Sequence, residues 1–255
     1  MGDQYGVRYY RGQKDIGEAR RFSWEYPVPD NDFWHDLPYS LSRNFLQSFS
    51  SEKLKRLSDC FDDGLCRLSK LELLAELLHK ELKEQEDAAA SNDSGQTFYD
   101  VEYTRWRAVC LAIASVQSEL GQRAVAEDTL RKLHEKRRDP ADLSHLHSLA
   151  GLLLAGGAYS ETEKMVTDVQ AWLDGCLGRD SPQALSARRV LAEAMWKQGL
   201  SRRNEAWNVL LEMRVITNEM GTGQYAVYQD EEKEMMDKLI LSLLQDQQQE
   251  ESTVE

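Results

Sequence analysis

SPQALSARRVLAEAMWKQGLSRRNEAWNVLLEMRVITNEMG, residues 181–221, predicts two amphipathic helices joined by a tight turn. Ser181 is a favoured N-cap residue. Pro182 suits the first helical position, because the backbone N–H that proline lacks would have no hydrogen-bond partner there. Gly199 predicts the end of the first helix, and Gly221 predicts the end of the second. The apolar residues of the first helix fall on one stripe at helical spacing: Leu185, Leu191, Ala192 and Met195. Because one hairpin cannot bury such stripes alone, we expect neighbours of the same kind.

The same pattern recurs along the chain from about residue 100. Apolar spacing predicts helices that end at 121, at 138 and at 156, a helix over about 160–173, and a last helix over about 225–245. Gly121, Gly157 and Gly199 each close the first helix of a pair, at spacings of 36 and 42 residues. Small residues that would let helices approach closely stand at matching positions: Ala114, Ala150 and Ala192 on first helices, and Ala126 and Ala206 on second helices.

These residues resemble the tetratricopeptide repeat, and the 42-residue unit, seen best in residues 177–199, is similar to the kinesin-light-chain variant. The resemblance covers about residues 103–220, and the whole repeat domain is expected over residues 98–245. It departs from the family at Cys110, Leu146 and Arg188, where a bulky aromatic residue is expected. It implies an all-α fold, a right-handed α-α superhelix of about three helical-hairpin repeats. The first helices would line a concave groove.

The resemblance also implies which residues face that groove. The predicted binding positions are Ser144, His147, Leu154, Ser186, Arg189, Glu193 and Trp196. Arg189, Glu193 and Trp196 lie four and three residues apart, which places a cation, a carboxylate and an indole on one helix face. Two interpretations stay open here. Arg189 and Glu193 form an ordinary exposed ion pair, or they anchor a peptide or a small ligand.

The rest of the chain predicts four further segments. Residues 1–49 are rich in aromatic residues and proline, and WEYPVPDNDFWHDLPYS (24–40) cannot form a regular helix, so we expect an extended arm packed on the helical body. Residues 50–82 have helical spacing with a break near Gly64. Residues 83–97 are polar and small, as in a flexible linker, and residues 246–255 are expected to form a disordered tail.

Composition restricts the partners. The formal net charge of −13 argues against nucleic acid and against anionic membrane surfaces, because phosphate groups require clustered Lys and Arg. We find no apolar run of the roughly 20 residues that span a membrane, and no signal-peptide pattern at the start of the sequence. The four cysteines form no C-x-x-C pair, which favours mostly buried free thiols in a reducing compartment, by default the cytoplasm.

No common catalytic or metal-binding motif is present in the sequence, so no catalytic residue, metal or cofactor is assigned. His145 and His147 lie two residues apart, and side chains at that spacing on a helix point apart. Asp59, Asp62 and Asp63 form D-x-x-D-D, whereas the magnesium motif of terpene cyclases is D-D-x-x-D.

The leading hypothesis is therefore a non-catalytic adaptor or scaffold that binds a protein or peptide in the groove. The alternative is a cofactor-free cyclase or isomerase with a pocket between the N-terminal arm and the repeats. Its apolar wall would come from Trp24, Trp34 and Tyr39, and its acid–base groups from His147, Arg189 or Glu193. A third expectation is self-association through the C-terminal helix, at Met235, Met236 and Leu239.

Overall fold

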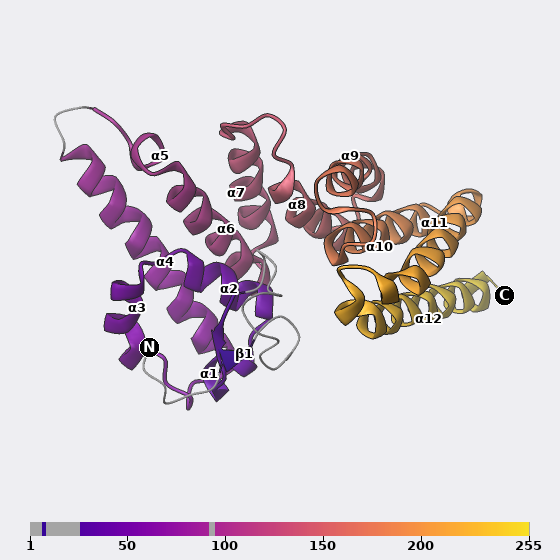
Figure 1. Ribbon diagram of the computed structural model, residues 1–255, viewed down its shortest axis with the longest axis horizontal. Coiled ribbons are helices and arrows are strands. Elements are labelled where there is room, and N and C mark those ends of the chain that lie inside the picture. The colour runs from indigo at the N-terminus through magenta and orange to yellow at the C-terminus, as the bar shows by residue number, and fades with distance from the viewer. Residues whose placement is uncertain (1–6, 9–25, 92–94, 255) are drawn as a thin grey trace. The chain divides into compact units, whose positions relative to one another are not determined.

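The computed structural model describes residues 7–8, 26–91 and 95–254, and it divides the chain into two compact units, residues 1–133 and 134–255 (Figure 1). In these described residues the regular structure is helical except for one short antiparallel pairing of β1 (Val7–Arg8) with β2 (Val28–Pro29). The predicted all-α class is confirmed. The division at 133/134 does not match the single repeat domain expected over 98–245.

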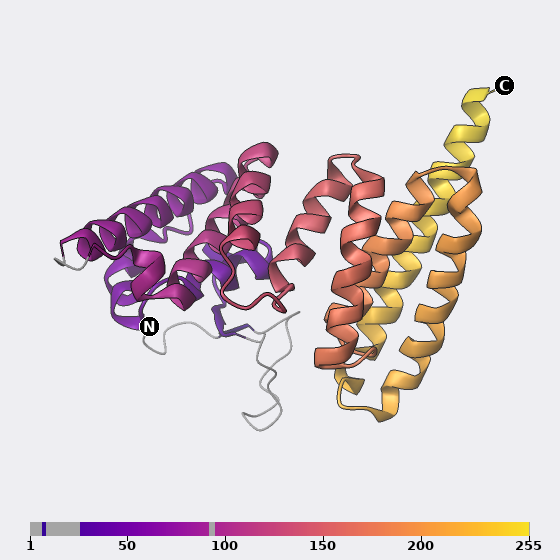
Figure 2. The same cartoon turned by 90° about the horizontal axis from the view of Figure 1, so that it is seen from above.

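Unit 2 is organised around one helix, α10 (Pro182–Lys197). It contacts α8 (Ser144–Ala155), α9 (Tyr159–Leu177), α11 (Leu200–Glu219) and α12 (Gln229–Val254). Short 3-10 turns over Met220–Thr222 and Ala226–Tyr228 connect α11 to α12. Figure 2 shows α9 to α12 running side by side. Three first helices are expected to lie side by side, over residues 107–119, 143–155 and 185–197, and the contact between the last two is present.

The helix ends follow the local sequence signals. The Ser181 hydroxyl accepts a hydrogen bond from the Ala184 N–H at 3.2 Å, with Pro182 in the first turn of α10. Gly157 has a φ of 82°, a backbone conformation that is energetically unfavourable for residues with a Cβ atom. There the N–H groups of Gly157 and Ala158 return to carbonyls of the last turn of α8, as in a Schellman motif. Positive φ angles also occur at the predicted stops Gly121 and Gly199, whereas near the predicted stop Gly221 α11 ends at Glu219 and a 3-10 turn follows.

The small residues of the repeat pattern lie in the interior. Five alanines are at most 3% exposed: Ala114, Ala126, Ala150, Ala192 and Ala206. Leu130 and Leu210, the large residues paired with Ala126 and Ala206, are also buried. A buried alanine lets two helix backbones approach closely, and a buried leucine four residues later fills the adjacent space.

Unit 1 contains the N-terminal helices and most of α7. Its helices are α1 (Asp32–His35), α2 (Tyr39–Gln47), α3 (Ser51–Leu57), α4 (Arg67–Ala90), α5 (Phe98–Val101), α6 (Tyr103–Glu119) and α7 (Arg123–Glu135), with a 3-10 turn over Ser58–Cys60. Helix α6 packs on α2 and α4, and the Asn44 amide donates to the Ser115 hydroxyl at 3.0 Å. The helix predicted to begin the repeats therefore belongs to the N-terminal core.

The aromatic residues of the N-terminal segment form that core. Phe33 and Trp34 are at most 1% exposed, and their rings contact Phe61; Trp34 also contacts Phe45. The buried Lys70 side chain fixes this segment to α4, because its Nζ donates to the Asp32 carbonyl at 2.7 Å and to Asp36 Oδ2 at 2.6 Å. The predicted packing of aromatic residues on the helical body is confirmed for these side chains. Residues 1–6 and 9–25 of the predicted arm lie outside the described residues.

Three predicted boundaries are wrong. Residues 32–35 and 39–47 of the predicted extended arm form α1 and α2, because Asn31 caps α1 and, after Pro38, Leu41, Phe45 and Leu46 supply a buried stripe. The predicted linker 83–97 is helical as far as Ala90, since Lys, Glu, Gln and Ala are strong helix formers. The predicted disordered tail continues α12 to Val254, and Asp246 within it pairs with Lys197 at 2.6 Å. The break expected near Gly64 lies between α3 and α4.

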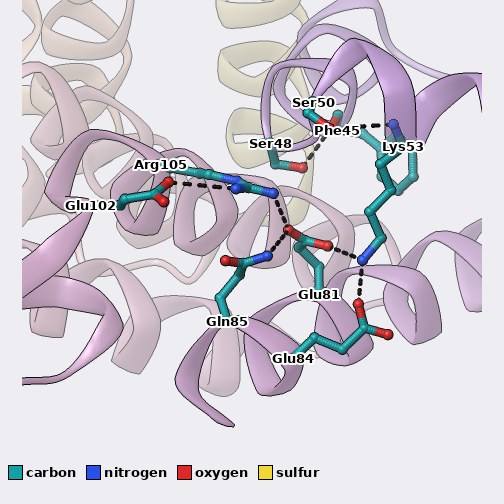
Figure 3. A network of polar contacts seen from close by, with 9 residues as sticks. All are labelled: Phe45, Ser48, Ser50, Lys53, Glu81, Glu84, Gln85, Glu102 and Arg105. Carbon is teal, nitrogen blue, oxygen red and sulfur yellow. Dashed lines mark hydrogen bonds and ion pairs between the residues drawn. The ribbon is translucent and has the colours of Figure 1, made fainter. Parts of the chain in front are cut away.

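One buried carboxylate joins three helices of unit 1 (Figure 3). The Glu81 side chain on α4 is fully buried and forms ion pairs with Lys53 of α3 and with Arg105 of α6, the latter at 2.6 Å from its Oε1. The Gln85 amide also donates to that Oε1, at 3.1 Å. Lys53 pairs in addition with the exposed Glu84. Two cations therefore compensate a charge that would be costly to bury alone.

The free cysteines differ from expectation in their exposure. Cys110 is buried, whereas Cys60, Cys66 and Cys176 are exposed. These three stand at or beside the ends of their elements rather than in helix interiors, so the general burial tendency of free cysteine does not apply to them. Within the described ranges, none of the helices combines the length and the apolar character that crossing a membrane requires.

Candidate functional site

Polar side chains gather along α10, where it contacts α8 and α12. We call His147 on α8, Arg189 and Glu193 on α10, and Glu232 on α12 the polar cluster. Three of these four residues are predicted groove positions. Since α10 contacts both other helices, residues from three separate segments of the chain face a common region.

An ion pair between α10 and α12 is the centre of the cluster. Arg189 Nη1 pairs with Oε2 of Glu232, whose side chain is 1% exposed. The other carboxylate oxygen, Oε1, is shielded from solvent and has no hydrogen-bond partner among the described residues. Glu232 was not predicted, since it lies within an acidic run. One signal in the sequence could have placed Glu232 on the inner face of α12. It lies four residues before Met236 and eleven before Leu243, and both of these residues are buried.

His147 is a neutral member of the cluster. Burial lowers the pKa of its imidazole to about 4, and the nearby charge of Arg189 adds to the effect. Its Nε2 is shielded from solvent without a hydrogen-bond partner in the described structure. His145 points elsewhere, with its Nε2 2.9 Å from Nδ1 of His134. The predicted divergence of the two histidines is thus confirmed.

Glu193 is a half-buried carboxylate that no cation of the described residues pairs with. Burial raises its pKa above the usual range; the charge of Asp246 raises it further, and that of Lys197 opposes the shift. The expected Arg189–Glu193 ion pair is absent from the described residues, because Arg189 binds Glu232 instead and Lys197 binds Asp246.

The remaining predicted groove residues have other surroundings. Ser144 donates its hydroxyl hydrogen to Asp142 Oδ1 at 2.6 Å, in the first turn of α8. Leu154 and Ser186 are half-buried. Trp196 is only 5% exposed, and the Arg203 guanidinium lies 5.1 Å from the centre of its ring. The tight turn at Gly199 brings Arg203 back over the indole, so little of the indole is accessible to solvent.

The aromatic residues of the enzyme alternative serve other purposes in unit 1. Trp34 belongs to the aromatic core, and the Tyr39 hydroxyl donates to the Tyr26 carbonyl at 2.8 Å. Trp24 lies outside the described residues. Among the residues that the structure describes, no group of three or more His, Cys, Asp or Glu side chains is arranged to hold a metal ion. Asp63, from the acidic cluster, accepts the Phe33 N–H at 2.8 Å.

The C-terminal helix presents a different surface from the expected one. Met236 is 3% exposed, so it belongs to the interior of unit 2 rather than to an open end. Met235 and Leu239 are half-buried. Self-association through α12 stays a prediction, with Met236 removed from it.

Comparisons of the chain with protein-family models, with curated proteins and with solved structures find no match. Function is therefore inferred from the chemistry of the polar cluster. It offers a guanidinium that Glu232 already neutralises, a neutral imidazole and a carboxylate that has no cation partner in the described part of the chain. This set is suited to hold a positively charged group.

Proposed function

We propose that this protein is a non-catalytic adaptor that binds a peptide or protein partner on the face formed by α8, α10 and α12. The contacts of α10 with α8 and with α12 support it, since first helices of stacked hairpins adjoin in this way. The glycine stops and the buried alanines are further support. The proposal includes a right-handed superhelix of hairpins. The sequence pattern predicts about three of them.

The observation that carries the proposal is the carboxylate of Glu193, which no cation of the described residues pairs with. A half-buried carboxylate loses part of its hydration, and the raised pKa expresses that cost. A lysine or arginine side chain from a partner would recover the lost interaction with a charge-assisted hydrogen bond. The net charge of −13 would in addition attract a basic segment over longer distances.

The backbone of α8 adds room on the same face. Gly151 stands one turn beyond His147, and a Cβ built on it would meet no atom within 4 Å. Glycine in a helix interior is unfavourable by roughly 1 kcal/mol relative to alanine, so its presence there needs a reason other than helix stability. Space for a partner side chain is such a reason.

Peptide selection tests the proposal. The full chain is immobilised and 12-residue peptides are selected on it by phage display, and the binding of selected peptides is then measured by fluorescence anisotropy. We expect Lys and Arg to be enriched, and Glu193→Gln to weaken binding about tenfold, which corresponds to one charge-assisted contact. Asp168→Asn, an exposed change on α9, is the matched control that leaves binding unchanged.

Two results would contradict the proposal. One is a selection that enriches no sequence on the folded chain. The other is a set of selected peptides that bind Glu193→Gln and Arg189→Ala as tightly as the original chain, because those peptides would then contact another surface.

A further inference from the structure

Helix α11 is apolar on two opposite faces. Its inner face is buried through Ala206, Leu210, Met213 and Ile216. Its outer face carries an exposed apolar stripe of Leu200, Trp207, Leu211 and Val215, with exposed fractions of 75%, 38%, 45% and 56%. We call these four residues the outer stripe. Their spacing of seven, four and four residues places them on one line along the helix.

Exposed single apolar residues are common, but a continuous line that includes a tryptophan is not. Trp207 has an indole on the surface, and tryptophan is the residue most often found to dominate a protein interface. The outer stripe runs for about four turns, so it matches the length of a bound helix rather than that of a single side chain.

Carboxylates edge the outer stripe on one side. Glu205, Glu212 and Glu219 are spaced by seven residues and are all exposed. Glu205 and Glu212 contact Arg202 and Arg179, at 3.2 and 2.9 Å. Glu212 also lies 3.7 Å from the buried Arg188, so Glu205 and Glu212 are partly neutralised, whereas Glu219 has no ion pair among the described residues. On the other edge, Arg214 is 3.9 Å from Asp237 of α12.

We propose that the outer stripe binds an amphipathic helix of a partner protein whose apolar face is bordered by Lys or Arg. The apolar residues of that helix would cover Trp207 and Leu211, and its cations would face the three glutamates. This surface belongs to α11, whereas the polar cluster belongs to α8, α10 and α12. The adaptor would therefore carry two independent binding surfaces on one unit.

A second copy of this chain fits the outer stripe less well. An antiparallel two-fold pairing of α11 with itself would place the two rows of glutamates side by side, and like charges at such distances repel. The net charge of −13 opposes self-association further. A cationic amphipathic helix avoids both costs.

Two designed peptides test this inference on the full chain. Each is an 18-residue helix with leucines at three- and four-residue spacing; lysines flank the leucines in one peptide and glutamates in the other. By fluorescence anisotropy, we expect the lysine peptide to bind at least tenfold more tightly than the glutamate peptide. Trp207→Ser and Leu211→Ser should each weaken its binding about tenfold or more, as for interface anchors.

Matched controls separate this surface from others. Leu68→Ser removes an equally exposed leucine, 57% exposed on α4, and should leave binding unchanged. Glu193→Gln should also leave it unchanged, so failure of the polar cluster as a site and failure of the outer stripe are distinguishable. Should Trp207→Ser unfold, as seen by circular dichroism, Leu200→Ser at the 75% exposed position replaces it.

The inference is overturned by equal affinity for both peptides, by no binding of either, or by equal losses in Leu68→Ser and Leu211→Ser. It is also overturned if sedimentation shows a dimer that Leu211→Ser dissociates, because a second copy would then be the occupant.

Discussion

The guanidinium of Arg188 on α10 and the carboxylate of Asp174 on α9 form a two-point ion pair, with Nη1–Oδ1 and Nη2–Oδ2 distances of 2.8 and 2.7 Å. The Arg188 side chain is 2% exposed. Arg188 stands where the resemblance to tetratricopeptide repeats implies a bulky aromatic residue. An ion pair therefore occupies a position where an apolar side chain would otherwise pack. It joins α9 to α10.

Loss of this pair should destabilise unit 2. Arg188→Ala leaves both a cavity and a carboxylate without its partner, for which we expect a loss of about 3 kcal/mol in the free energy of unfolding. Urea unfolding, followed by circular dichroism, measures it. Arg179→Ala removes a guanidinium that is 60% exposed and should cost at most about 0.5 kcal/mol. Equal effects of the two changes would show that the buried pair contributes no more than a surface one.

The double-mutant cycle with Asp174→Ala isolates the interaction itself. We expect a coupling energy of about 1–3 kcal/mol, because the two groups are in direct contact and one is buried. Additive losses would mean that each residue acts through separate contacts.

The sequence predicts well what is decided locally. The cap at Ser181 and the stop at Gly157 depend on a few neighbouring residues, and the structure has both. Burial of Ala150 and Ala192 follows from helical periodicity. Partners distant in the chain are not predicted in this way. The ion pairs Arg188–Asp174 and Arg189–Glu232 form only when the helices pack against one another.

The candidate site shows the same difference between features decided locally and contacts between distant residues. Arg189 and Glu193 are predicted because they share a helix face, and His147 because the resemblance implies a groove position, but the fourth member, Glu232, lies 43 residues after Arg189. Trp196 shares that face too, yet Arg203 covers it. The separation into two units was also missed, since α6 has the pattern of a repeat helix while its contacts are with α2 and α4. Periodicity identifies a buried face without identifying what covers it.

The buried Glu81 of unit 1 provides a second stability prediction (Figure 3). Glu81→Gln keeps the volume but removes the charge that Lys53 and Arg105 share, so we expect a loss of about 3 kcal/mol in the unfolding free energy. Glu84→Gln is the control, since Glu84 is 45% exposed and contacts the same Lys53. Its loss should not exceed about 0.5 kcal/mol. Thermal unfolding of the two variants beside the original chain gives the comparison.

Two glycine-to-alanine changes should have opposite signs. At Gly157, where φ is 82°, alanine strains the backbone and should cost about 1 kcal/mol. At Gly151, inside α8 with open space at the Cβ position, alanine should stabilise the protein by about 0.5–1 kcal/mol. Denaturant midpoints of both variants test this. A loss at Gly151 would show that the helix needs glycine there for packing.

The buried imidazole of His147 makes stability depend on pH. In the unfolded chain it takes up a proton near its ordinary pKa of 6.5, but in the folded protein burial and Arg189 hold the pKa at about 4. Between these two values the unfolded state binds more protons, so acidification favours unfolding. From pH 7 to pH 5 this group should remove about 2 kcal/mol of stability. His147→Gln should lose that part of the pH dependence. His79→Gln, which replaces an exposed histidine on α4, should retain the pH dependence of the original chain. Parallel pH profiles for the original chain and His147→Gln would mean that the imidazole is hydrated in solution and titrates normally.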